Sequence, residues 1–180
     1  NGTPRLKYNM IKKIINEPKQ FLNFLVTYFP GSSGNMLRRL LYKVRLNSLG
    51  TKLYTEIGFI LTCPRNIVIG NNAHFMRDCS LNSCNGKINI GDNTGVGPGT
   101  VIISSNHSFF SKQSYTEQPL NEKDIVIGKN VWIGANSSIL AGAQIGDNVI
   151  IGSGVVVTGR VPEDSIVVSG SRKLSMTKRR

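Results

Sequence analysis

The chain has 180 residues and two histidines, and one of these, His107, lies in an unusual place. It occurs in the segment Ser104–Asp124, SSNHSFFSKQSYTEQPLNEKD, which lacks the six-residue period of the sequence on either side. A neutral imidazole can accept a proton from an attacking hydroxyl group, which is general-base chemistry. The other histidine, His74, precedes the apolar Phe75, so we expect its side chain to point outward or to sit at a corner. His107 is therefore the preferred candidate for proton transfer.

The cysteines indicate neither a metal centre nor a disulfide framework. Cys63, Cys79 and Cys84 are odd in number and form no CxxC pair, which is typical of reduced thiols in a cytosolic protein. A site that combined His74 with Cys79 and Cys84 would match no familiar zinc spacing. We therefore expect no metal and a cytoplasmic location.

A repeat of six residues predicts the elements that must position these side chains. From position 127 onward every sixth residue is aliphatic and β-branched: Ile127, Ile133, Ile139, Ile145, Ile151 and Val157. Three places after each of these, Asn or Gly recurs until Arg160 ends the series, and both types tolerate the positive φ of a left-handed corner. The same period occurs in residues 69–81 and 90–102, with a phase slip that we attribute to a small insertion in NSCNGK.

A strand that runs and turns every six residues predicts a parallel β-helix. Three such runs close a triangular coil of about 18 residues, and stacked coils bury a column of aliphatic side chains. We expect this mainly β domain over residues 51–170. The distance from Ile102 to Ile127 is 25 residues, one more than four hexads, so residues 104–124 should form a loop that protrudes from one coil.

The stretch IVIGKNVWIGANSSILAGAQIGDNVIIGSGVVVTG resembles the hexapeptide-repeat acyltransferases, and the resemblance covers roughly residues 30–175. It implies a left-handed β-helix, although the usual crossover rule favours the opposite hand. It also implies a homotrimer with acetyl-CoA, the acyl donor, bound between adjacent prisms. The lead-in PGSSGNMLRRLLYKVRLNSLG is similar to acetyltransferases from capsular and lipopolysaccharide gene clusters.

The resemblance assigns His107 as the general base of acetyl transfer to an alcohol. The imidazole would take the hydroxyl proton and return it to the departing thiolate, with backbone N–H groups stabilising the oxyanion and no acyl-enzyme. An imidazole usually needs a partner that fixes its tautomer. Glu117, Glu122, Asp124 or a backbone carbonyl could serve, and the sequence does not choose among them.

Substrate contacts are predicted less directly. Trp132 matches an aromatic residue beside the acceptor site of the family, although a packing role is equally compatible with its position. Asn82 and Asn106 are candidates for binding a sugar hydroxyl, with turn formation as the alternative.

Contacts to acetyl-CoA are expected from the last coils. Ala135, Ser153 and Thr158 match positions where the family contacts the pantetheine arm. Two departures from the family occur here: Gly159 replaces a common Lys, and Arg172 stands where relatives often have Pro. Arg172 and Lys173 are candidates for the missing cation near the CoA phosphates. The full set of predicted donor-binding residues is Ala135, Ser153, Thr158, Gly159, Arg172 and Lys173.

Both ends of the chain are basic. Residues 1–50 hold nine Lys/Arg against one acid, and the tail 171–180 holds five Lys/Arg and no acid. Within this N-terminal segment of residues 1–50 we expect helices over residues 10–46, with PGSSG as a break and Gly50 ending the second helix. The predicted apolar stripes contain Phe21, Phe24, Leu25, Tyr28, Leu37, Leu40, Leu41 and Val44.

Two roles remain open for these helices: a cap on the open end of the β-helix, or a basic amphipathic surface that contacts an anionic membrane. The longest apolar run, residues 21–29, is too short to span a bilayer. No nucleic-acid-binding motif is present, so we expect no nucleic-acid partner.

The sequence therefore predicts an acetyl-CoA-dependent O-acetyltransferase that modifies a sugar hydroxyl, as in surface polysaccharide biosynthesis. A streptogramin-type or other xenobiotic acetyltransferase is the main alternative, and a non-catalytic β-helix scaffold is another. A γ-type carbonic anhydrase needs three histidines around a metal, and this chain has two histidines in total.

Overall fold

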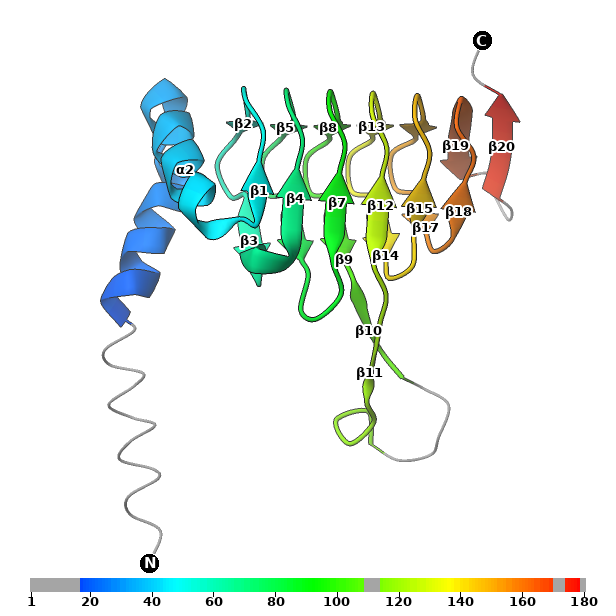
Figure 1. Cartoon of the computed structure of the whole chain (residues 1–180), viewed down its shortest axis with the longest axis horizontal. Helices are drawn as coiled ribbons and strands as arrows, with labels where there is room; N and C mark the ends of the chain where they lie inside the picture. Colours follow the sequence, from blue (N-terminus) through cyan, green and yellow to red (C-terminus); the bar gives the residue numbers. More distant parts are fainter. Residues whose placement is uncertain (1–16, 109–113, 170–173, 179–180) are drawn as a thin grey trace, which may run out of the picture.

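The computed structural model describes residues 17–108, 114–169 and 174–178, with side chains described up to residue 169. A three-sided prism of stacked coils makes up most of it, with two helices at its N-terminal end and a hairpin that projects from one edge (Figure 1). Followed from that end, the coils wind left-handed, so the predicted left-handed parallel β-helix is confirmed (Figure 1).

Each side of the prism is one sheet. Face 1 consists of β1 (Ser48–Leu49), β4 (Ile67–Ile69), β7 (Ile88–Ile90), β12 (Ile125–Ile127), β15 (Gln144–Ile145) and β18 (Arg160–Val161). Face 2 consists of β2 (Tyr54–Thr55), β5 (His74–Phe75), β8 (Gly95–Val96), β13 (Trp132–Ile133), β16 (Ile150–Ile151), β19 (Ser165–Ser169) and β20 (Leu174–Lys178). Face 3 consists of β3 (Ile60–Thr62), β6 (Ser80–Asn82), β9 (Val101–Ile103), β14 (Ser138–Leu140) and β17 (Val156–Val157).

Neighbouring strands on each face pair in parallel, apart from β20, which pairs antiparallel with β19 at the end of face 2. Residues 174–178 of the predicted basic tail thus extend the sheet of face 2. The register is that of identical positions in successive coils. Ile102 pairs with Ile139, which pairs with Val157 on face 3.

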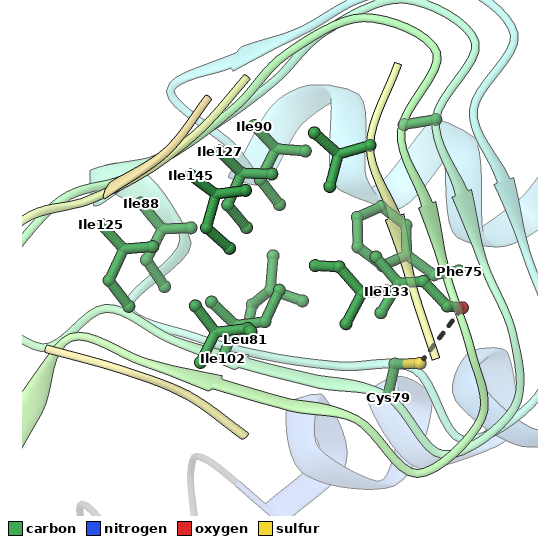
Figure 2. Packing of buried hydrophobic residues seen from close by; sticks show 14 of the residues in the cluster. Phe75, Cys79, Leu81, Ile88, Ile90, Ile102, Ile125, Ile127, Ile133 and Ile145 are labelled. Atoms are coloured by element: carbon green, nitrogen blue, oxygen red, sulfur yellow. Dashed lines mark hydrogen bonds between the residues drawn. The ribbon is translucent and has the colours of Figure 1, made fainter. Parts of the chain in front are cut away.

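The inward positions of the hexads build the core. The six aliphatic residues that continue from position 127 are all buried, as predicted, and Phe75, Leu81 and Ile90 extend the column toward the N-terminus. Figure 2 shows the isoleucines of successive coils stacked above one another. An isolated coil could not bury these side chains, so neighbouring coils supply the missing contacts.

The corners carry the left-handed residues that the repeat predicts. Asn130, Asn136 and Asn148 have φ values of 54°, 54° and 57°, and Gly142 and Gly154 also have positive φ. Asn tolerates this conformation at small cost, which explains its recurrence at the turn of each hexad.

The edge between face 3 and face 1, here called the loop edge, is where the coils vary in length. Its first coil carries a short 3₁₀ helix, η1 (Pro64–Asn66), the second the insertion that the sequence predicts in 82–87, and the third the predicted loop. Within that loop β10 (Ser105–His107) and β11 (Leu120–Glu122) form an antiparallel hairpin that leaves the prism (Figure 1).

The N-terminal helices differ from the prediction at both boundaries. Residues 17–28 form one helix, and α2 (Gly31–Arg45) follows after only Phe29 and Pro30. The break is therefore shorter than PGSSG, because Gly31 turns the chain with a φ of 71° and then begins α2. The second helix also ends at Arg45 rather than Gly50, because β1 already begins at Ser48.

The helices cover the N-terminal end of the prism, but not mainly through the predicted stripes. Tyr42 and Leu46 lie in the core, and Leu41 of the second stripe packs against it. Arg38 of α2 is 1% exposed. Its guanidinium group donates hydrogen bonds of 2.8 Å to Phe29 O, just after the first helix, and to Thr55 O of β2. The other predicted stripe residues remain exposed.

Candidate active site

His107 ends β10, where the hairpin leaves the loop edge, and its side chain is exposed. It pairs across the hairpin with Leu120. Its imidazole ring makes an edge-to-face contact with the Tyr115 ring, and the two ring centroids are 5.1 Å apart. An aromatic neighbour at this distance restricts the orientation of the imidazole. The position leaves a basic nitrogen accessible to a bound hydroxyl.

Two of the acids proposed as partners of His107 are bound elsewhere. The Glu122 carboxylate accepts hydrogen bonds from Asn85 Nδ2 at 2.8 and 3.0 Å, and Asp124 Oδ1 accepts one from the Lys87 N–H at 2.8 Å. Both acids therefore join the hairpin to the insertion in the coil below. Tyr115, which no sequence pattern singled out, is the ring contact of His107 among the described residues.

The insertions along the loop edge support one another and the hairpin. Ser83 Oγ donates to Cys63 O at 2.6 Å, Asn66 Nδ2 to Cys84 O at 2.6 Å, and Ser104 Oγ to Gly86 O at 3.2 Å. These bonds link three successive coils. The base of the hairpin is thus supported by the two shorter insertions below it, η1 and residues 82–87. This support determines where the hairpin that carries His107 leaves the prism.

Of the two candidate amides, Asn82 lies at the base of the hairpin. It ends β6 beside Ile103, and its carbonyl accepts the Ser104 N–H at 3.0 Å. Asn106 precedes His107 on β10 and pairs with Asn121. Alternate residues of a strand point to opposite sides, so Asn106 faces away from the side that carries His107. The structure therefore brings Asn82 and His107 to the same edge but turns the Asn106 side chain away.

The predicted donor-binding residues of the last coils flank face 3. Ala135 and Ser153 are neighbours at the corner between faces 2 and 3, where the Gly154 N–H donates to Ala135 O at 2.8 Å. Thr158 and Gly159 lie on the loop edge, above the coil that carries His107, and line a small hollow of about 90 Å³. Arg172 and Lys173 lie outside the described residues.

Arg160 also lines this hollow and was not singled out as a ligand from the sequence. Its side chain is exposed and directly follows Gly159. The available signal was its place at the end of the Asn/Gly corner series, where a cation replaces a turn residue. Arg160 is the cation of the described residues that lies closest in sequence to the missing family Lys.

Trp132 lies on face 2, which is opposite the loop edge in a three-sided prism. The indole ring covers Gly95 of the preceding coil, where a Cβ would lie 2.7 Å from Trp132 Cε3. The ring is 47% exposed, so it is a surface side chain and not a packing residue of the core. One chain therefore does not bring Trp132 and His107 together.

The remaining reactive groups do not form a second centre. Burial raises the pKa of the Cys79 thiol to about 11, and the thiol donates to Gly97 O at 3.1 Å. Among the residues that the structure describes, no three His, Cys, Asp or Glu side chains are grouped as a metal site requires.

Comparison with known families supports the repeat. The family model described as bacterial transferase hexapeptide (six repeats) matches residues 124–159. The crystal structure of a maltose O-acetyltransferase from Clostridium difficile 630 is similar over 91% of this chain and 85% of that chain, with 28% identity and a TM-score of 0.78. The family match thus coincides with the most regular part of the repeat, residues 124–159.

Further similar proteins differ in the part of this chain that they match. A galactoside acetyltransferase in complex with coenzyme A is 25% identical, with coverage of 89% and 78% and a TM-score of 0.75. The lipopolysaccharide biosynthesis O-acetyltransferase WbbJ of Escherichia coli K12 is 30% identical over 96 residues, which are 49% of each protein. The bifunctional protein GlmU of Streptococcus pyogenes is 32% identical over 90 residues, which are 50% of this chain. The match spans only 17% of GlmU and about half of WbbJ.

Proposed function

We propose that this hexapeptide-repeat protein is an acetyl-CoA-dependent O-acetyltransferase that acetylates a sugar hydroxyl in surface polysaccharide biosynthesis. One observation carries the proposal: an exposed imidazole, His107, on a hairpin that is braced at the loop edge. The hollow lined by Thr158, Gly159 and Arg160 begins at the same edge and reaches the buried Val157, Val161 and Val167 at the C-terminal end of the prism. It is the proposed region for the acetyl-CoA arm.

The reaction needs one residue that moves a proton twice. His107 accepts the proton of the acceptor hydroxyl as the oxygen attacks the thioester carbonyl, which forms a tetrahedral oxyanion. Backbone N–H groups of the coils are the available donors to that oxyanion. Collapse of the oxyanion breaks the C–S bond, and His107 returns the proton to the thiolate, so that the products are an acetyl ester and CoA.

The relatives support a sugar acceptor and a CoA donor. Maltose and galactoside are the acceptors named for the two structural relatives, coenzyme A is bound in the latter, and WbbJ is named for lipopolysaccharide biosynthesis. No feature of the described residues favours a streptogramin, and the hairpin argues against a scaffold. A cytoplasmic location would give access to acetyl-CoA.

A homotrimer is part of the proposal because a complete site requires two chains. His107 and Trp132 lie on opposite sides of one prism, so a neighbouring chain must supply one of them. Closed rotational symmetry allows each chain to give its hairpin to one neighbour and its face 2 to the other.

Contact with an anionic membrane is proposed for the exposed surface of the two helices, here called the helix surface. Its large apolar side chains, each at least 38% exposed, are Phe21, Leu22, Phe24, Leu25, Tyr28, Phe29, Met36, Leu37, Leu40 and Val44. Exposed Lys19, Arg39 and Lys43 supply positive charge beside them. Apolar side chains interspersed with cations suit the interface of an anionic bilayer. None of the helices in the described segments is long and apolar enough to span a bilayer.

Acetyl-CoA consumption with panels of free sugars, nucleotide sugars and streptogramins tests the reaction. We expect turnover with a sugar and a loss of about 10²–10⁴ in rate for His107→Ala, with an unchanged oligomer and melting temperature. Gln144→Ala, an exposed change on face 1, is the matched control and should keep full rate. Near-normal turnover by His107→Ala would exclude the proposed base.

Sedimentation with vesicles tests the membrane contact separately. The double variant Leu40→Glu/Val44→Glu should lose binding to vesicles of phosphatidylglycerol and phosphatidylcholine, and high salt should weaken binding of the wild type. Val126→Glu, an exposed valine on face 1, should bind normally. Equal sedimentation of all three proteins would contradict a contact through the helix surface.

A further inference from the structure

Face 2 carries a row of aromatic rings at equivalent positions of successive coils. Tyr54 pairs with His74, His74 with Gly95, and Gly95 with Trp132, so the four positions form one outward-facing line. The Tyr54 and His74 rings lie 5.7 Å apart, and Trp132 leans over the glycine toward them. Tyr54 is 41% exposed, which leaves the row accessible from solvent.

A hollow of about 330 Å³ opens between His74 and Trp132. Beside it, the corner asparagines form a ladder of amide hydrogen bonds, with Asn72 Nδ2 bound to Asn93 Oδ1 at 2.9 Å and Asn130 Nδ2 to Asn148 Oδ1 at 2.8 Å. Between Asn93 and Asn130 no side-chain hydrogen bond is formed within the described part of the chain. The ladder is thus interrupted where the hollow lies, and one amide donor and one amide acceptor are left for a ligand.

The chemistry of the hollow selects a neutral, hydroxyl-rich ligand. None of the residues that line it carries a fixed charge. They are Asn72, Asn93, Asn130, His74, Thr94, Gly95, Val131 and Trp132. Asp92 and Lys129 precede Asn93 and Asn130 at the same corner but do not line the hollow, and Arg77 Nε and Glu56 Oε2 are paired at 3.5 Å on the coil corner nearer α2. Aromatic faces that stack on the apolar side of a ring, with amides at its hydroxyl groups, are what a sugar requires.

We propose that face 2 binds a neutral oligosaccharide along the row from Trp132 through His74 to Tyr54, so that the acceptor is a glycan chain and not a single sugar. This inference rests on the proposed function, in which the acceptor is a sugar. Adjacent strands lie about 4.8 Å apart, so the row spans roughly 14 Å over three coil steps. One sugar ring fills the hollow at Trp132, and further units reach His74 and Tyr54.

In the proposed trimer the Trp132 end of the row meets the hairpin of the neighbouring chain. The sugar held at Trp132 would present its hydroxyl to His107 of that chain, and the rest of the glycan would extend toward α2. Each further aromatic contact stabilises the bound glycan, so affinity should rise with chain length until the row is filled.

The intrinsic fluorescence of Trp132 measures this binding directly, because it is the only Trp of the chain. The probes are mono- to hexasaccharides of neutral glucan, galactan, mannan and N-acetylglucosamine series, added to the intact oligomer without acetyl-CoA. We expect one series to change the emission, with an affinity that rises about tenfold from monosaccharide to tetrasaccharide. Oligogalacturonides of the same lengths, which are charged, should not bind.

Variants distinguish the contribution of the aromatic row, which should affect binding of longer glycans, from that of the hollow, which should bind a single sugar. Tyr54→Ala should abolish most of the gain in affinity with chain length and leave monosaccharide binding unchanged. Tyr28→Ala, an equally exposed tyrosine on the helix of residues 17–28, is the matched control and should behave as the wild type. If Tyr54→Ala loses no affinity for the longer probes, the row is not a glycan subsite.

The remaining outcomes also decide the question. No emission change with any series, or equal affinity for all lengths, would overturn the proposal. The proposed reaction is judged independently by acetyl transfer to a monosaccharide and its loss in His107→Ala. A failure of the glycan subsite can thus be told from a failure of the O-acetyltransferase function.

Discussion

At the scale of single residues, the loop edge separates side chains that hold the chain from side chains that remain accessible. Glu122 and Asp124 are bound to the neighbouring insertion through Asn85 and Lys87, so they stabilise the base of the hairpin. His107 is exposed beyond that base and contacts a ring rather than a carboxylate. The chemistry at this edge therefore depends on a small number of contacts that can be changed without touching the core.

Tyr115 is predicted to position the His107 imidazole. Tyr115→Ala removes a ring contact of about 0.5–1.5 kcal/mol, so kcat should fall by about two- to tenfold while the KM for acetyl-CoA and the melting temperature stay unchanged. Tyr115→Phe keeps the ring and should restore most of the rate. Steady-state kinetics of both variants measure the difference. A Phe variant as slow as the Ala variant would assign the effect to the hydroxyl group and not to the ring contact.

At the scale of elements, the sequence predicted the prism well because one rule is repeated. Inward aliphatic residues and corner asparagines recur at a fixed spacing in the hexads, so the sequence alone assigns Ile133 and Ile151 to the inward side. The hairpin has no such repetition. That a loop protrudes followed from the phase shift, but its contacts with Asn85 and Lys87 are long-range and leave no local pattern.

The N-terminal helices bury side chains that their apolar stripes do not predict. An apolar stripe predicts burial, yet Leu40 and Val44 are exposed and the charged Arg38 is buried. Arg38 is buried in place of an apolar residue because backbone carbonyls at the end of the helix of residues 17–28 and on β2 need hydrogen-bond donors. One guanidinium group can donate to several of them at once. Burial depends here on hydrogen-bond partners that a helical wheel does not show.

Arg38 is therefore predicted to fix both helices to the prism. Arg38→Met leaves the Phe29 and Thr55 carbonyls without their donor, which should lower the free energy of unfolding by about 3 kcal/mol. Arg39→Met changes an exposed neighbour and should have no comparable effect. Urea denaturation of the two variants measures the difference. Equal midpoints would show that the carbonyls find other donors.

Tyr42 makes the attachment of α2 sensitive to alkaline pH. Burial raises its pKa from 10.0 to about 12, so the unfolded chain loses this proton first and stability falls as pH rises from about 10 to 12. Tyr42→Phe removes this loss, although it costs about 1 kcal/mol at neutral pH because the 2.9 Å bond to Phe59 O is lost. Unfolding measured from pH 8 to 12 should show the two curves converging and crossing at pH ~11. Parallel curves would place the ionisation outside the folding equilibrium.

At the scale of the whole molecule, the prism separates the groups that the proposed reaction needs. A triangular coil puts an edge and the opposite face on different sides, so His107 and Trp132 cannot meet within one chain. The proposed site, which uses both residues, therefore requires two copies of the chain. The order of the residues in the sequence does not show this separation, and the three-dimensional arrangement does.

Mixed oligomers test this arrangement. His107→Ala and Trp132→Ala should each reduce activity at least tenfold, since one removes the base and the other the acceptor contact. In a trimer assembled randomly from equal amounts of both variants, a site with the His107 of one chain and the Trp132 of the next arises in about a quarter of the interfaces. Coexpression of the two chains with different tags, followed by tandem purification, keeps only mixed trimers. Each of these has one such site among its three interfaces, so about a third of wild-type activity should be recovered. A mixed oligomer no more active than the single variants would mean that both residues act within one chain or that one of them does not act at all.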